Sequence, residues 1–312
     1  MNQDSQLVAR ILKEINKVVI GKENVVAKVL TAILAKGHIL LEDIPGVGKT
    51  TLALSFSKVM DLGYNRLQFT PDVLPTDVVG FHLPSKDGME YQYRPGPIMC
   101  NLFLADEINR TSSKTQSALL EVMEEGTVTV DGITREVPNP FTVIATQNPM
   151  GSIGTHSLPE SQLDRFMVRL TMGYPDIKSE IHILKGRRSI NPLDSLIPIA
   201  RIDDIIRMKE LVEEVYIHDS IYEYIANLVG ETRTHSLIGL GVSPRGSIAL
   251  TNMAKANAFL RMRDYVIPDD VMNVFPDIAA HRIVLESKAR VNKVTVEQVI
   301  EAILQQVKPP KL

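Results

Sequence analysis

The nine residues Glu42–Thr50 read EDIPGVGKT, a spacing of small residues, lysine and threonine that suits phosphate binding. They follow the short apolar run His38–Leu41 and precede a segment with helical character. A Gly-rich turn that enters a helix presents successive backbone N–H groups, and the positive end of the helix dipole, to an anion. Lys49 would then reach the β- and γ-phosphates, and the Thr50 hydroxyl would hold Mg²⁺.

The first position of this loop departs from the usual pattern, because Asp43 stands where a glycine is expected. The part that would contact phosphate, residues 45–50, is intact. A chance match or a plain turn is the alternative, and the strand-to-helix context argues against it. The loop therefore predicts binding of a nucleoside triphosphate.

Two consecutive carboxylates follow another apolar run, since Leu102–Ala105 leads directly into Asp106 and Glu107. At the carboxyl end of a parallel strand, Asp106 would bind Mg²⁺, directly or through water. Glu107 would activate an attacking water as a general base. The pair could instead cap a helix, but its place behind the phosphate loop and a further predicted strand favours hydrolysis.

Two more polar residues could complete such a site. Asn148 follows the apolar run Phe141–Thr146 and could hydrogen-bond both the γ-phosphate and the attacking water, although Asn-Pro is also a common turn. Arg165 precedes the last apolar run. It is either an ordinary surface arginine paired with Asp164 or an arginine finger given to a neighbouring subunit.

Arg245 lies just inside the start of a predicted helix, after the good N-cap residue Ser243 and Pro244. The helix dipole disfavours a cation at this end. Such an arginine is better explained if an anion, for example a γ-phosphate, lies against it.

The elements that must position these residues alternate between short apolar runs and helical segments, which predicts an α/β core built on a five-stranded parallel sheet with helices on both faces. Ser113–Glu125 is the clearest connecting helix. The five runs are His38–Leu41, Arg66–Phe69, Leu102–Ala105, Phe141–Thr146 and Met167–Thr171. Two Asp-Gly hairpins interrupt the alternation, at about residues 77–95 and at 127–137.

Beyond about residue 173 the pattern is helical only, which predicts a second, all-α lid domain. We therefore divide the chain into an α/β nucleotide-binding core, residues 1–173, and a lid, residues 174–312. Predicted helices of the lid lie near residues 177–188, 202–215, 219–233, 245–262, 268–286 and 295–306.

Composition narrows the function classes. The 312 residues carry a net charge of −3, so the bulk basic footprint typical of nucleic-acid binding is absent. A single cysteine, Cys100, excludes an internal disulfide and suits a reducing compartment. The polar start lacks a signal-peptide pattern, and no apolar run is long enough to span a bilayer, so we expect a cytoplasmic protein without a membrane span.

Taken together, the motifs resemble the MoxR family of AAA+ ATPases over about residues 15 to 300. The resemblance rests on LLEDIPGVGKT, RPGPIMCNLFLADEINR, KTQSALLEVMEEG, FTVIATQNP, LPESQLDRF and GVSPRG. It implies that Lys49 and Thr50 are Walker A, Asp106 and Glu107 Walker B, Asn148 sensor 1, Arg165 the arginine finger and Arg245 sensor 2. It implies nucleotide contacts at Ile20, Gly21, Pro45, Gly46, Val47, Gly48, Lys49, Thr50 and Thr51, and a metal held by Thr50 and Asp106. The two hairpins match the family's helix-2 and presensor-1 inserts.

The resemblance further implies ATP and Mg²⁺ as cofactors and a homo-oligomer, a hexameric ring with ATP between subunits. It implies chaperone-like remodelling, maturation or cofactor insertion in a partner protein complex, with a von Willebrand A domain as a common partner. A nucleic-acid-dependent motor of helicase or replication type is the alternative. The target, the oligomer size, the cis or trans action of Arg245, and the roles of His156 and Arg169 stay open.

Overall fold

Five parallel strands form the central sheet of the computed structural model, which describes residues 2–85, 91–148, 158–186 and 191–311. The order across the sheet is β2-β5-β8-β1-β9, and every neighbouring pair is parallel. The predicted sheet is confirmed, with small shifts at the strand ends. Its strands are β1 (Ile39–Glu42), β2 (Tyr64–Gln68), β5 (Leu102–Asp106), β8 (Thr142–Gln147) and β9 (Val168–Leu170).

Helices cover both faces of this sheet, which explains why its central strands are mostly apolar. Alternate side chains point to opposite faces, so on β1 Ile39 and Leu41 join one buried cluster while Leu40 joins the other. The first face is covered by α1 (Asn2–Ile15), α2 (Glu23–Leu34) and α3 (Lys49–Val59), and the second by α5 (Ser113–Glu125). As predicted, α5 ends at Glu125, and its C-cap Gly126 adopts φ +66°.

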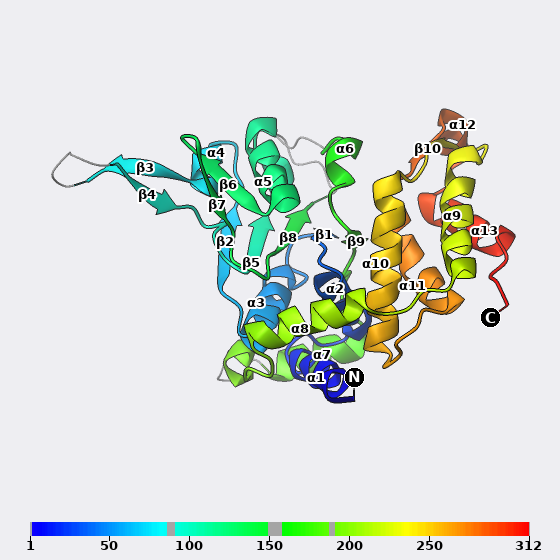
Figure 1. Cartoon of the computed structure of the whole chain (residues 1–312), viewed down its shortest axis with the longest axis horizontal. Coiled ribbons are helices and arrows are strands. Elements are labelled where there is room, and N and C mark those ends of the chain that lie inside the picture. The colour runs from blue at the N-terminus through cyan, green and yellow to red at the C-terminus, as the bar shows by residue number, and fades with distance from the viewer. Residues whose placement is uncertain (1, 86–90, 149–157, 187–190, 312) are drawn as a thin grey trace.

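The predicted hairpins are present and project from one end of the molecule (Figure 1). In the first, β3 (Gly80–Pro84) pairs with β4 (Tyr91–Pro95), and its turn lies outside the described residues. The short helix α4 (Pro75–Val79) before it was not predicted. In the second, β6 (Thr127–Val130) and β7 (Ile133–Glu136) are joined by the predicted Asp-Gly turn.

Side-chain contacts tie these hairpins together, among them one of 3.3 Å between Arg135 Nη2 on β7 and His82 Nε2 on β3. His82 Nδ1 on β3 lies 2.7 Å from Asp131 Oδ2 in the turn of the second hairpin. The Arg135 guanidinium of β7 lies 4.0 Å from the centroid of the Tyr93 ring on β4, a cation–π geometry. The hairpins therefore contact each other as well as the sheet.

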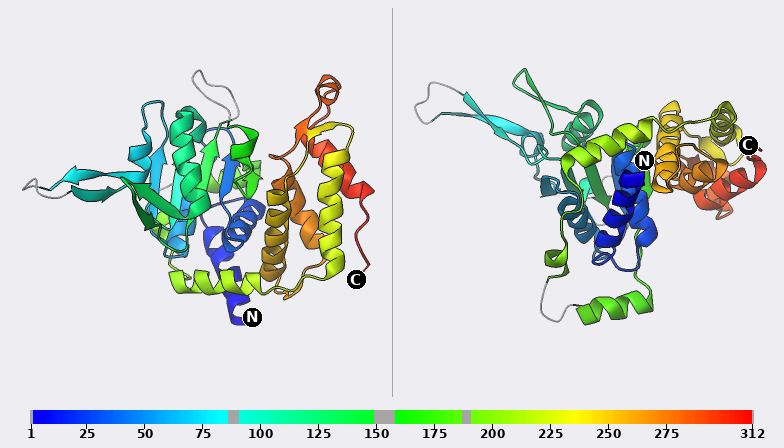
Figure 2. Two further views of the ribbon diagram at one scale, coloured as in Figure 1. Left: turned by 45° about the horizontal axis from the view of Figure 1, so that its top comes forward. Right: turned by 60° about the horizontal axis from the view of Figure 1, so that its bottom comes forward.

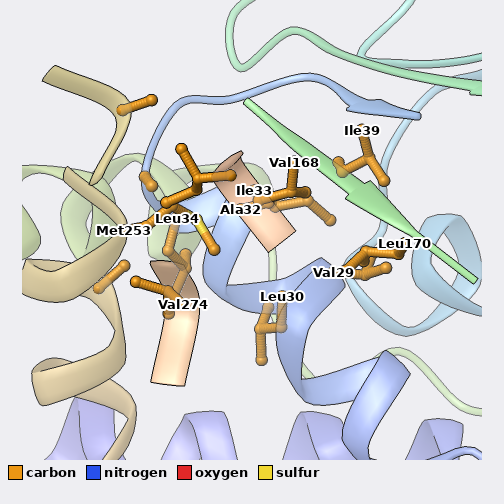
Figure 3. Close-up of a cluster of buried hydrophobic side chains, with 14 of the residues drawn as sticks. Val29, Leu30, Ala32, Ile33, Leu34, Ile39, Val168, Leu170, Met253 and Val274 are labelled. Carbon is orange, nitrogen blue, oxygen red and sulfur yellow. The ribbon is translucent and has the colours of Figure 1, made fainter. Parts of the chain in front are cut away.

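From α9 (Asp219–Thr234) onward the lid lies beside the core, at the opposite end from the hairpins, whereas α8 (Ile202–Glu213) runs alongside the core itself (Figures 1 and 2). The buried side chains of the lid continue the cluster on the first face of the sheet, as Met253 and Val274 do against Leu34 and Ile33 (Figure 3). The division at residues 173 and 174 stays a prediction. The elements after β9 are α7 (Ile177–Gly186), η2 (Pro192–Ser195), α8 (Ile202–Glu213), α9 (Asp219–Thr234), β10 (Ile238–Leu240), α10 (Pro244–Leu260), α11 (Pro268–Ala279), β11 (Val284–Leu285), α12 (Ser287–Val291) and α13 (Val296–Gln306).

One predicted lid helix is too long. The helix expected over residues 268–286 ends at Ala279, and the chain then turns so that β11 pairs antiparallel with β10. Just past this end, the buried guanidinium of Arg282 donates to the backbone carbonyls of Phe166 and Met167, which anchors the turn to the core. The lid is thus helical apart from this small two-stranded sheet.

Within the described residues, no helix combines the length and the apolar character that crossing a bilayer requires.

Candidate nucleotide-binding and hydrolysis site

The predicted phosphate loop connects β1 to α3. Gly46 and Gly48 adopt φ of +86° and +96°, a region in which glycine carries no steric penalty. Gly48 is the N-cap of α3, so the helix begins at Lys49 and its first turn contains Thr50 and Thr51. The free N–H groups of this turn and the helix dipole provide the anion-binding end that the sequence predicts.

Asp43 is the buried support of this loop, not a defect in it. Its Oδ1 accepts the N–H of Ile44 at 2.8 Å, and its Oδ2 accepts the N–H groups of Met172 and Gly173, both at 2.6 Å. The side chain thereby joins the start of the loop to the segment that follows β9. A carboxylate with three backbone donors explains why an acidic residue replaces the expected glycine.

Lys49 lies between the loop and the carboxylates. Its Nζ donates to the carbonyls of Asp43 at 2.7 Å and Ile44 at 3.2 Å. Burial lowers the pKa of Lys49, while the nearby charges of Asp43, Asp106 and Glu107 raise it. These four residues therefore share one electrostatic environment at the carboxyl edge of the sheet.

The two predicted Walker B carboxylates have different partners. Asp106 Oδ1 accepts the Thr146 hydroxyl at 2.6 Å, and its Oδ2 pairs with Arg66 Nη2, also at 2.6 Å. Glu107 adopts φ +58° and donates its N–H to Thr146 Oγ1 at 2.9 Å, while its Oε2 pairs with Arg110 at 2.6 Å. Thr146 thus fixes both residues at the end of β5.

Asn148 follows β8 directly, at the same edge of the sheet as Asp106. Its carbonyl accepts the Asn109 side chain at 3.2 Å. Next to it, Gln147 donates to Glu42, which also pairs with Arg169 at 2.9 Å. Arg169 also donates to the lid carbonyl of Ala280, and His156 lies outside the described residues.

A cavity of about 490 Å³ opens beside the loop and contains the predicted adenine contact Ile20. Gly21 adopts φ +71°, and a Cβ there would lie 2.2 Å from Ser179 Oγ of α7, so only glycine fits. Sequence reasoning missed the walls contributed by α7 and η2. The cavity is lined by Lys17, Val18, Val19, Ile20, Lys22, Gly46, Val47, Gly48, Thr51, Met172, Pro175, His182, Ile183, Asn191, Pro192, Leu193 and Ser195.

Arg165 and Arg245 lie together, and neither lines this cavity. Both pair with Glu124 on α5: Arg165 Nη1 lies 2.8 Å from Glu124 Oε2, and Arg245 Nη2 bonds to Glu124 Oε1. The pairing of Arg165 with Asp164, weighed from the sequence, is wrong, because Asp164 pairs with Arg282 at 2.6 Å. The anion inferred to lie against Arg245 exists, but it is a carboxylate of the same chain.

Three residues of this region were not singled out by the sequence: Arg66, Thr146 and Glu124. Thr146 carries the clearest signal, because it is a polar residue near the carboxyl end of a mostly apolar strand. Arg66 stands in a predicted strand beside that of Asp106, whereas Glu124 resembles any charged residue on the outer face of a helix.

Comparisons with known proteins agree with this geometry. Residues 38–168 match the profile of the ATPase family associated with various cellular activities (AAA), and residues 230–303 match the AAA lid domain. The chain is 48% identical to the uncharacterized protein YeaC of Bacillus subtilis, covering 97% of this chain and 95% of YeaC. It is 38% identical to the chaperone MoxR1 of Mycobacterium tuberculosis, covering 97% of this chain and 82% of MoxR1.

Solved structures show the same architecture. A crystal structure of a Cytophaga hutchinsonii protein assigned as an ATPase superposes with a TM-score of 0.92 at 37% identity, covering 99% of this chain and 96% of that one. An MCM homologue from Methanopyrus kandleri superposes with a TM-score of 0.61 at 18% identity, covering 91% of this chain and 62% of that one. The second likeness is one of fold alone.

Proposed function

The chain belongs to the MoxR family of AAA+ ATPases, and from this we propose that it hydrolyses ATP with Mg²⁺ to drive chaperone-like remodelling of a partner protein complex. One observation carries the proposal. Lys49 starts the phosphate-loop helix after β1, and Thr146, which pairs with Leu41 of β1, donates its hydroxyl to Asp106 at the end of β5, so the lysine and both carboxylates lie at one edge of the sheet. A phosphate-binding lysine and a pair of carboxylates at one sheet edge are what metal-assisted hydrolysis of a phosphoanhydride needs.

In this proposal different residues of the chain bind the nucleotide and activate the attacking water. Lys49 and the N–H groups at the start of α3 would bind the β- and γ-phosphates, and Ile20 would contact the adenine. Glu107 would take a proton from the attacking water, and Asn148 would orient that water.

Thr50 and Asp106 would hold Mg²⁺, which supplies neutralisation of phosphate charge when bound. Two oxygen donors suit Mg²⁺, which keeps several waters and substrate oxygens as its other ligands. Consistent with a metal that arrives with the nucleotide, no cluster of three or more metal-ligating side chains exists in the described parts of the chain.

We also propose that the active form is a homo-oligomeric ring, a hexamer, in which Arg165 and Arg245 act on the nucleotide of the next subunit. Their side chains are 32% and 45% exposed, and they lie outside the wall of their own cavity. An exposed pair of guanidinium groups away from its own phosphate loop is available to a neighbour.

The partner is proposed from the family. The relative MoxR1 is named a chaperone, which supports a protein target. Maturation or cofactor insertion, and a partner with a von Willebrand A domain, are proposed from the family resemblance alone. The net charge of −3 and the matched relatives do not favour the nucleic-acid motor. Measuring the ATPase rate with and without DNA separates the two, because strong stimulation by DNA would support the motor.

Replacing Glu107 by Gln tests the hydrolytic role. The variant should retain ATP binding but lose most turnover, because its amide cannot accept the proton from water. Glu121→Gln, on the exposed side of α5, is the matched control and should behave as the unaltered protein. Unchanged turnover in Glu107→Gln would remove this residue from its assigned role.

Mixed subunits test the shared site. Arg165→Ala alone and Lys49→Ala alone should each lose activity. A mixture should recover part of it, because an intact phosphate loop then meets an intact arginine. The absence of any recovery at matched assembly would contradict action between subunits.

A further inference from the structure

Glu124 is the common partner of the two arginines described above, although they come from different parts of the chain. Arg165 precedes β9 in the core, and Arg245 lies in the first turn of α10 in the lid. One carboxylate oxygen receives each guanidinium. Arg165 Nη1 also donates to the Leu120 carbonyl of α5 at 2.9 Å, so α5 fixes one edge of that guanidinium.

The backbones behind these arginines are joined as well. Asp164, next to Arg165, accepts the Ser243 hydroxyl at 2.8 Å and Arg282 Nε at 2.6 Å. Ser243 is the N-cap of α10, two residues before Arg245. Arg282 is 5% exposed and donates to the carbonyls of Asp164 and Phe166 at 3.0 and 2.7 Å.

Gly246 makes this arrangement possible, because a Cβ there would lie 2.9 Å from Arg282 Cδ. The glycine that follows Arg245 therefore leaves room for the buried guanidinium. Core and lid thus meet at a fixed junction directly behind the two arginines.

The guanidinium groups of Arg165 and Arg245 carry like charges a few ångströms apart, which repel each other even near the surface. Glu124 offsets that repulsion. Among the contacts of the described residues, each guanidinium gives a single terminal nitrogen to Glu124. An arginine has five N–H donors in a planar fork, so other donors remain for a second anion.

We infer that Glu124 is a positioning residue that holds Arg165 and Arg245 side by side as one unit for the γ-phosphate of the neighbouring subunit. The inference rests on the proposed function, and it assigns Glu124 to the side of the interface that donates the arginines. The opposite reading is that the carboxylate competes with phosphate and withholds the arginines. The two readings predict opposite changes in rate.

The test is Glu124→Gln, with Glu121→Gln as the control on the same helix. Neutral glutamine no longer offsets the repulsion, so kcat of the assembled protein should fall about tenfold to a hundredfold, the range expected for a misplaced reacting group. The KM for ATP should change little, because the subunit's own phosphate loop is untouched. In an Arg165→Ala background the same substitution should cause much less further loss.

Complementation gives a readout that a merely structural defect would not produce. Mixed with Lys49→Ala, the Glu124→Gln subunit should regain activity, because its intact phosphate loop meets an unaltered Arg165–Arg245 pair. Mixed with Arg165→Ala it should not, since every interface then has an impaired donor. Size and thermal unfolding of each variant confirm matched assembly and folding.

The outcomes distinguish a failure of the positioning role of Glu124 from a failure of the proposed ATPase function. An unchanged or raised kcat in Glu124→Gln overturns the positioning role. So does a failure of Lys49→Ala to rescue Glu124→Gln while it still rescues Arg165→Ala. If neither mixture recovers activity, the shared site itself fails. If Glu107→Gln turns over normally, the proposed hydrolytic mechanism fails.

Discussion

Replacing Asp43 by Asn tests whether a buried charge holds the phosphate loop in place. The carboxylate is 6% exposed and accepts three backbone N–H groups, from Ile44, Met172 and Gly173. Asparagine has one acceptor oxygen. It can therefore keep at most the two bonds now made by Oδ2, and its NH₂ group then faces the N–H of Ile44.

The size of the effect follows from these contacts. A hydrogen bond to a charged group contributes about 1.5–3 kcal/mol and a neutral one about 0.5–1.5 kcal/mol. Losing one charged bond and making two others neutral costs about 5 kcal/mol, and relief of the buried charge offsets part of that cost. We expect the free energy of unfolding to fall by about 2–4 kcal/mol.

Urea unfolding at pH 7 measures this change, and ATP titration measures its consequence for the loop. Affinity for ATP should fall, because the carbonyl that holds Lys49 belongs to Asp43. Asp61→Asn is the control, an exposed aspartate at φ +49°, where asparagine is also tolerated. A loss below about 1 kcal/mol, or one equal to that of the control, would refute the reasoning.

Three further predictions concern other parts of the chain. Burial lowers the pKa of His38 to about 4, so between pH 6.5 and pH 4 the unfolded chain binds a proton at this histidine that the folded chain does not. The free energy of unfolding should therefore fall by about 3 kcal/mol over this range, and acid unfolding should show a smaller fall in His38→Gln. Burial lowers the pKa of Lys209 to about 8, so at pH 7 the folded chain holds a buried charge, and Lys209→Met should raise the free energy of unfolding by up to about 3 kcal/mol. This gain should shrink between pH 8 and pH 10.5, because the folded lysine loses its proton there while the unfolded lysine keeps it. Arg135→Gln removes the contact with Tyr93 and should speed amide exchange in both hairpins; faster exchange in β6–β7 alone would show that they move independently.

The sequence was sufficient for the sheet and the phosphate loop because both depend on local patterns. Strands buried on two faces must be mostly apolar, so β5 and β8 stand out from their surroundings. Glycine at positions 46 and 48 likewise permits the positive φ that this loop adopts. These features need no knowledge of what lies beside them.

The missed features depend on contacts between distant positions. Glu124 and Arg245 are 121 residues apart, and nothing local marks either as the partner of the other. The end of α11 is similar, because helical spacing continues past Ala279 while the buried Arg282 anchors the turn to the core. Strands as short as β10 and β11 also carry no alternation to detect.

Asp106 and Glu107 each have one buried partner, Thr146, and one exposed arginine partner. This difference indicates which contacts would change when ATP binds. Thr146 is fully buried and fixes Asp106 through its hydroxyl and Glu107 through the backbone. Arg66 and Arg110 pair with the same two carboxylates, but each is 44% exposed. The carboxylates themselves are only 12% and 26% exposed, so each arginine can leave only when another cation takes its place beside the carboxylate. We therefore expect the arginines to exchange for metal and water, while the bonds of Thr146 keep the Asp106 carboxylate oriented and hold the backbone of Glu107 in place.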